Sequence, residues 1–260
     1  MKAKKLLVAL SMLGLTSTVA FGQLQDQKDV TFTMDLQPIL QLNMTTPSQI
    51  DFTFDDINSY YAGITRYGAT ILKVSSTVNW DLYAVGRSNG NTGAGFWDQQ
   101  IRYGTAAAGG ETNQLPLSAL ELRQNTPNAA TGGTGTFEDY SAAFPAVASP
   151  NGANSLYVDP ANSNTPPLIT HKYIAGHKGT TAVGTDGIAG GSYLTSNGLT
   201  SNYFYSIDYR ILPGLPAIFP MAFAADGTTA QDLVTINGAG SFAQPGVYTM
   251  YVQYILLEDQ

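Results

Sequence analysis

The chain ends on GVYTMYVQYILLEDQ, residues 246 to 260, and this stretch decides the fold. Large side chains recur in it at every second position: Tyr248, Met250, Val252, Tyr254 and Leu256. A period of two places these side chains on one face of an extended strand and the intervening residues on the other. The stretch therefore predicts a half-buried β-strand whose first face lies in the core.

The same period of two recurs in shorter stretches bounded by turn signals. These stretches are 30–36, 50–54, 78–84 and 203–209, and 168–175 is a further candidate strand. Residues 72–84 predict a β-hairpin around Ser75-Ser76-Thr77, and we assign Trp80 and Leu82 to the same inner face as the C-terminal alternation. We find no long segment of helical period and no repeat at a fixed spacing. The pattern predicts an all-β fold, an Ig-like or pilin-like antiparallel β-sandwich.

The first 22 residues have the features of a signal peptide. Three lysines stand among the first five residues, and the apolar run 6–15 is too short to span a bilayer. Small residues at Ala20 and Gly22 predict cleavage before Gln23. We expect an exported chain, either extracellular or on the cell surface, with the periplasm as the other destination. No other segment reads as a membrane span.

The composition narrows the classes of partner. Removing residues 1–22 takes away three lysines and no acid, so 9 basic residues face 19 acidic ones. A chain this acidic is not expected to bind nucleic acid, which requires clustered Lys and Arg. The absence of cysteine excludes disulfides and thiolate metal sites, so the fold has to be stabilised by its core.

Residues 23–260 read as one elaborated β-sandwich domain. Residues 86–154 are rich in Gly, Ala, Asn and Thr, and only 99–103 and 115–123 within them look ordered. Long segments of this kind are uncommon inside compact domains unless they are functional or disordered. We interpret 86–154 as a large Gly/Asn-rich loop insertion.

The sequence offers little support for catalysis. Only four glutamates are present, and the chain lacks a Gly-x-Ser-x-Gly elbow, a His-Glu-x-x-His pair and a phosphate loop. We therefore expect a protein that is not an enzyme.

Metal and cofactor signals are equally weak. His171 and His177 do not complete a zinc site without neighbouring acids, and we expect no cofactor. Calcium is the alternative, because Asp-rich turns can supply oxygen ligands, although Asp-Gly is more often turn chemistry. The candidate turns are Asp55-Asp56 with Asn58, Asp186-Gly187 and Asp226-Gly227.

Aromatic residues beside polar, Gly-rich stretches suggest a second kind of surface. Trp97, Tyr103 and Tyr193 are the candidate ligand-binding residues, because exposed rings near Asn, Gln and Asp suit glycans or a partner protein. The other interpretation is that such rings cap the sandwich under its loops.

Two short segments resemble known bacterial surface proteins. Trp80-Asp81-Leu82 is a Trp-x-Leu motif, and Tyr248 followed by Tyr254 and Leu256 is similar to the second motif of the WxL family, which carries Trp at the position of Tyr254. The closing Gly-x-Tyr strand also resembles pilin-like sandwiches of the spore-coat-protein-U type. These resemblances imply a β-sandwich on the bacterial surface, associated non-covalently with the wall in the first family and polymerising in the second.

Together these features predict a secreted, non-enzymatic structural or adhesion protein of the cell surface. Its partners would be copies of itself, in a fibre or a surface layer, or other surface components. The predicted assembly strand is Val30, Phe32, Met34 and Leu36, which would pair with another copy by main-chain hydrogen bonds; the alternative is that it pairs within its own sheet. A carbohydrate- or cell-wall-binding module is the alternative function.

Overall fold

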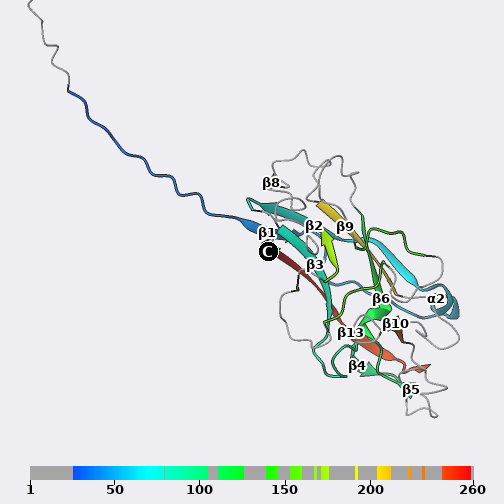
Figure 1. The fold of residues 1–260 in the computed structure, drawn as a ribbon. Coiled ribbons are helices and arrows are strands. Elements are labelled where there is room, and N and C mark those ends of the chain that lie inside the picture. Colours follow the sequence, from blue (N-terminus) through cyan, green and yellow to red (C-terminus); the bar gives the residue numbers. More distant parts are fainter. Residues whose placement is uncertain are drawn as a thin grey trace, which may run out of the picture. The chain divides into compact units, whose positions relative to one another are not determined.

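The computed structural model describes residues 26–78, 80–104, 111–125, 139–145, 153–159, 167–168, 171–175, 191–192, 204–211, 222–223, 230–231 and 242–258. The chain divides into two compact units, Met1–Gln37 and Pro38–Gln260. Strands dominate these described ranges, and the only helical elements in them are α2 (Ile57–Ala62) and the single turn η1 (Leu117–Ala119) (Figure 1). The all-β prediction is confirmed. None of the helices described is long and apolar enough to cross a membrane.

The larger sheet is antiparallel and contains four main strands. In spatial order these are β1 (Leu40–Met44), β2 (Ile64–Ser76), β9 (Phe204–Ile211) and β6 (Leu120–Asn125), and β8 (Gly191–Ser192) pairs with the end of β2. Strands β9 and β2 carry alternating large side chains, as the period of two requires. β6 lies inside the range 86–154, so that range supplies a strand of this sheet and is not only a loop insertion.

The second sheet has the order β14 (Tyr251–Glu258), β3 (Trp80–Arg87) and β7 (Tyr173–Ala175), also antiparallel. β2 and β3 follow each other in the chain but belong to different sheets, so the predicted hairpin at 72–84 is wrong. Residues 77–78 join the two sheets, and the Ser76 hydroxyl holds the turn by bonding both Val78 N–H and Val78 C=O. A period of two identifies the buried face of each strand but not the sheet to which it belongs.

Side chains from both sheets form one hydrophobic core. β2 contributes Leu72 and Val74, and β3 contributes Trp80 and Leu82. β9 contributes every second residue from Tyr205 to Ile211. The indole of Trp80 meets the ring of Tyr205 edge to face, with centroids 6.2 Å apart and planes at 77°. This contact joins the two sheets directly, in a geometry that aromatic pairs favour. The Ig-like or pilin-like type of the sandwich stays a prediction.

The C-terminal stretch is not the single strand that its period predicts. β13 (Gly246–Thr249) pairs with β4 (Asp98–Arg102), whereas β14 pairs with β3, so the chain changes partner at Met250. Gly246 permits the close approach of β13 to β4, since a Cβ there would lie 2.3 Å from the Ile101 carbonyl oxygen. Tyr248 accordingly packs in a separate small cluster with Leu115 and Ala243.

Two further strand pairs are short. β5 (Glu111–Thr112) runs parallel to β12 (Phe242–Ala243), and β10 (Ala222–Phe223) pairs with β11 (Ala230–Gln231). Residues 50–54 alternate between half-buried and exposed, and Ile50, Phe52 and Phe54 pack on the core. They are assigned to no strand, so the strand predicted there is absent.

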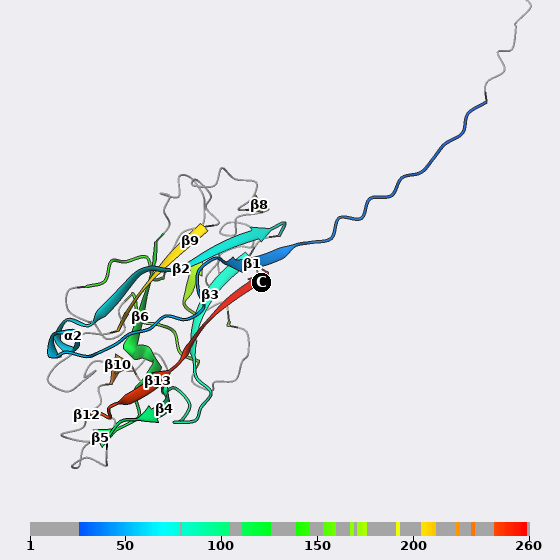
Figure 2. The same ribbon diagram turned by 180° about the vertical axis from the view of Figure 1, so that it is seen from behind.

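Residues 26–37 contain no helix or strand, and Figure 1 draws them in blue as an extended segment. The alternating residues 30–36 are therefore not paired in a ladder within the described part of the chain. Within the second unit, β1 lies beside β14, and both views of the ribbon place the C-terminal end of β14 next to β1 (Figures 1 and 2).

Candidate functional site

The segment 30–36 presents a row of exposed apolar side chains. Val30, Phe32, Met34 and Leu36 are between 74% and 91% exposed, which is unusual for side chains of this size. Removing each from water would contribute about 1.5–3 kcal/mol. Because large exposed apolar side chains are a feature of interaction surfaces, residues 30–36 are a candidate interaction segment.

The edge formed by β1 and β14 is the second notable feature. In the ranges that the structure describes, β1 pairs only with β2 and β14 pairs only with β3. Both strands have little of the usual protection of an edge, since β1 contains no charged residue and no proline, and the only charge in β14 is Glu258 at its last position. Among the described residues, therefore, the outer edges of β1 and β14 have no main-chain partner strand.

The inner face of β14 is incompletely covered. Every residue of β3 is buried, but Val252, Tyr254 and Leu256 of β14 are only half-buried although they pack on the same core. The structure thus brings together the core residues Trp80, Leu82, Met250, Val252, Tyr254 and Leu256 that the sequence predicts, with Tyr248 apart from them.

The hydroxyl of Tyr254 reaches the interior from this edge. It shares a hydrogen bond with the hydroxyl of Tyr209, which in turn donates to Thr70 Oγ1 at 2.7 Å. Burial raises the pKa of Tyr254 well above its usual value, and the neighbouring Tyr209 adds to the rise. Both hydroxyls therefore stay neutral and act as a structural link between the sheets.

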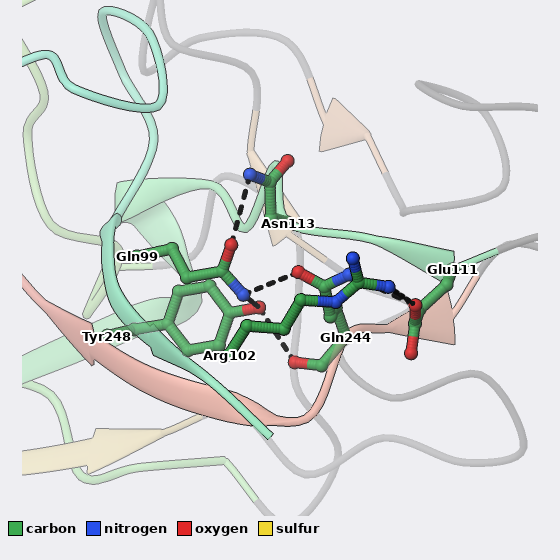
Figure 3. A network of polar contacts seen from close by, with 6 residues as sticks. All are labelled: Gln99, Arg102, Glu111, Asn113, Gln244 and Tyr248. Carbon is green, nitrogen blue, oxygen red and sulfur yellow. Dashed lines mark hydrogen bonds and ion pairs between the residues drawn. The ribbon is translucent and has the colours of Figure 1, made fainter. Parts of the chain in front are cut away.

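A network of amide and charged side chains joins the small strand pairs at another part of the fold (Figure 3). Arg102 Nη2 donates to Glu111 Oε2 at 2.8 Å, and Gln244 Nε2 donates to the same oxygen at 3.0 Å. Gln99 Nε2 bonds the Tyr248 hydroxyl at 3.1 Å, and that hydroxyl donates to the Gln244 carbonyl at 2.7 Å. These groups satisfy one another across β4, β5, β13 and the connection between β12 and β13.

The network keeps Tyr248 protonated. The pKa of Tyr248 is raised to about 12, mainly by burial and in part by the Glu111 carboxylate, while the hydrogen bond from Gln99 and the charge of Arg102 act to lower it. A tyrosine hydroxyl that donates a hydrogen bond to a backbone carbonyl is positioned to hold β13 and not to exchange protons with a substrate. No sequence signal identifies this network, because its members are common polar residues from two separate segments, 99–111 and 244–248.

The predicted ligand-binding aromatics are only partly available. The indole N–H of Trp97 donates to the Pro116 carbonyl at 3.1 Å, and its ring packs on the small cluster of Leu115 and Ala243. Tyr103 is exposed, whereas Tyr193 lies outside the described residues. Trp97 is thus engaged in the structure, and Tyr103 is the one of these three whose side chain the structure shows exposed.

The buried charges have structural partners. Asp98 accepts backbone N–H bonds from the loop before it, including Asn91 N at 2.7 Å. Arg210 pairs with Glu121, and Arg87 Nη1 lies 3.1 Å from Asp159 Oδ2. Burial raises the pKa of Glu121, although Arg210 opposes the rise. Because each of these groups is bonded within the fold, none of them forms an open site.

The described residues contain no set of side chains placed to bind calcium. Asp56 Oδ1 accepts the backbone N–H of Ser59 at 3.0 Å and caps α2. No group of three or more His, Asp or Glu side chains is placed to hold a metal ion in the part of the chain that the structure describes. The turns at 186–187 and 226–227 lie outside it, as does His177.

The contacts of His171 with Tyr157 and Leu168 should depend on pH. Its ring stacks on Tyr157 with centroids 4.5 Å apart, and its Nδ1 accepts the Leu168 N–H at 2.9 Å, so the bound form is neutral. Burial lowers its pKa from the ordinary 6.5, while Asp159 partly opposes this. Because the folded state disfavours protonation of the His171 ring, the contribution of this neutral ring to stability is complete above pH 6.5 and is lost as the pH falls below it.

An NMR titration of the imidazole signals, assigned with His177→Gln, should give a His171 pKa below 6.5. A value above it would contradict this geometry.

Comparison with known proteins does not place the chain in a family. No family model matches it, and no curated protein matches it significantly.

Proposed function

We propose that the chain is an exported, non-enzymatic structural or adhesion subunit of a bacterial cell surface that assembles with copies of itself. In this proposal, residues 30–36 of one copy pair as a β-strand with the sheet of another. The observation that carries the proposal is the row of four exposed apolar side chains at alternate positions in a segment without a strand partner among the described residues.

The chemistry of strand addition fits this segment. Main-chain hydrogen bonds supply affinity, and alternate side chains supply specificity by entering the core of the partner. Seven residues in extended form span about 23 Å, at about 3.3 Å per residue, which is the length of an ordinary strand. The intervening Thr31, Thr33 and Asp35 are polar and would face water.

The pairing of β3 with β14 supports the resemblance to bacterial surface proteins. Leu82 of the Trp-x-Leu motif lies opposite Leu256 of the C-terminal motif in the ladder. Trp80-Asp81-Leu82 and the part of the C-terminal motif from Tyr254 to Leu256 are thus neighbours in one sheet, whereas Tyr248 lies in β13, which pairs with β4. This agrees with a surface β-sandwich and adds nothing in favour of wall binding over self-assembly.

Deleting residues 23–36 tests the proposal. The deletion leaves the unit Pro38–Gln260, which contains the whole hydrophobic core, so we expect a folded chain that remains monomeric. The chain beginning at Gln23 should instead form filaments or higher oligomers. Circular dichroism would check the fold, and negative-stain microscopy with sedimentation velocity would check assembly. Unfolding on deletion, or assembly that survives it, would contradict the proposal.

A further inference from the structure

We infer that the acceptor of residues 30–36 is, in a second copy, the edge of β14 that has no strand partner among the described residues. This inference rests on the proposed self-assembly and adds to it the surface that receives the strand. The starting observation is the contrast between β3, which is buried along its whole length, and its neighbour β14, whose core-facing side chains are half-buried.

A strand added to the edge of β14 would complete this burial. Neighbouring strands lie about 4.7–4.9 Å apart, so the added side chains would lie directly beside Val252, Tyr254 and Leu256. The incoming segment also places an apolar side chain at every second residue, and its four such residues match the length of the eight-residue β14. Cross-strand pairs of this kind contribute about 0.2–1 kcal/mol each beyond the backbone bonds.

The position of β1 also favours residues 30–36 as the strand added to the edge of β14. Leu40 and Met44 of β1 are partly exposed, and β1 lies beside β14 within the second unit. A strand that extends the sheet of β14 on its open side would come to lie next to β1, so its apolar side chains would also cover these two residues. One added segment would then cover apolar side chains at the edges of both sheets.

The edge of β1 itself is the weaker acceptor. β1 has five residues, and among them only Leu42 packs on the core. β14 offers eight residues and three core-packed side chains at alternate positions. Because the gain from strand addition grows with the apolar area that it covers, β14 is the edge that the segment 30–36 fits better.

The charges on the two partners agree with this pairing. The only charge in β14 is Glu258, its exposed last residue, and the only charge in 30–36 is Asp35, whose position alternates away from the apolar row. Pairing would therefore bury no unpaired charge, which would otherwise oppose it strongly.

Engineered cysteines can locate the acceptor, because the natural chain has none. One population carries Thr33→Cys, on the polar face of the segment. It is mixed with a second, tagged population that carries Gln253→Cys on the exposed face of β14, and the covalent heterodimer is quantified on non-reducing gels. Thr31→Cys and Tyr251→Cys sample the alternative registers. Asn43→Cys on β1 and Tyr67→Cys, an exposed residue of β2, are the matched controls.

We expect the cross-link to β14 to exceed the Tyr67→Cys control about 10-fold, because a disulfide needs Cα atoms about 4.4–6.8 Å apart. If Gln253→Cys does not fold, Tyr251→Cys takes its place. Assembly with a cross-link to Asn43→Cys, or with equal yields at all positions, would overturn β14 as the acceptor but leave self-assembly standing. Absence of any assembly of the natural chain would overturn both.

Discussion

Replacing Trp80 by alanine should lower the free energy of unfolding by about 3–5 kcal/mol, which is the usual result of removing a buried large aromatic side chain. Trp80 is 1% exposed and lies against Tyr205 of the opposite sheet. Its loss leaves a cavity between the two sheets at the point where their side chains meet. For a domain whose total stability is typically about 5–15 kcal/mol, this is a large fraction.

Urea denaturation followed by circular dichroism measures this effect, and Tyr67→Ala is the matched control. Tyr67 is also a large aromatic residue on a strand, but it is 74% exposed, so its replacement should change stability by less than about 0.5 kcal/mol. Equal effects at the two positions would show that Trp80 does not join the sheets as described.

The double replacement Phe32→Asp with Met34→Asp should abolish assembly, which we expect as at least a 100-fold loss in apparent association. Both side chains belong to the exposed apolar row. Pairing would force two carboxylates into an apolar environment without partners, and each burial of this kind costs several kcal/mol. Sedimentation velocity over a range of concentrations measures the association.

The control for this replacement is Thr31→Asp with Thr33→Asp, which adds the same charge to the polar face of the same segment. This variant should assemble nearly as the natural chain does. Neither variant should change the thermal midpoint of the second unit, since residues 30–36 contribute nothing to the core of that unit. Equal loss of assembly in both variants would point to net charge and not to the apolar row.

The sequence predicts the core well because burial follows the period of two. Trp80 and Leu82 are buried, and Val252, Tyr254 and Leu256 pack on the same core. The period does not reveal which strands pair, and for that reason the predicted hairpin at 72–84 is in fact a connection between two sheets. Pairing is decided by contacts distant in sequence, and local alternation contains no information about them.

The break at Met250 has a similar cause. Alternation continues through 246–256, yet β13 and β14 pair with different strands, and Tyr248 joins a separate cluster. Polar groups are harder still to predict. Gln99 and Gln244 form a network only because the pairing of β13 with β4 brings the connection between β12 and β13 beside β4, and neither residue stands in a recognisable motif.

In the N-terminal segment, the alternating pattern of the sequence does not predict whether a strand forms. Residues 30–36 alternate as well as any strand in the chain, but the structure describes them without a strand assignment. Alternation makes a segment suitable for pairing and does not supply the partner. Residues 30–36 are suitable for strand pairing but have no strand partner among the described residues, and for this reason we propose that they pair with another copy.

Negative-stain microscopy should compare the chain beginning at Gln23 with the same chain lacking residues 23–36. If residues 30–36 mediate self-assembly, the first will form filaments or regular oligomers and the second discrete folded monomers. Discrete monomers in both samples, at concentrations up to those of the sedimentation experiments, would contradict self-assembly through residues 30–36.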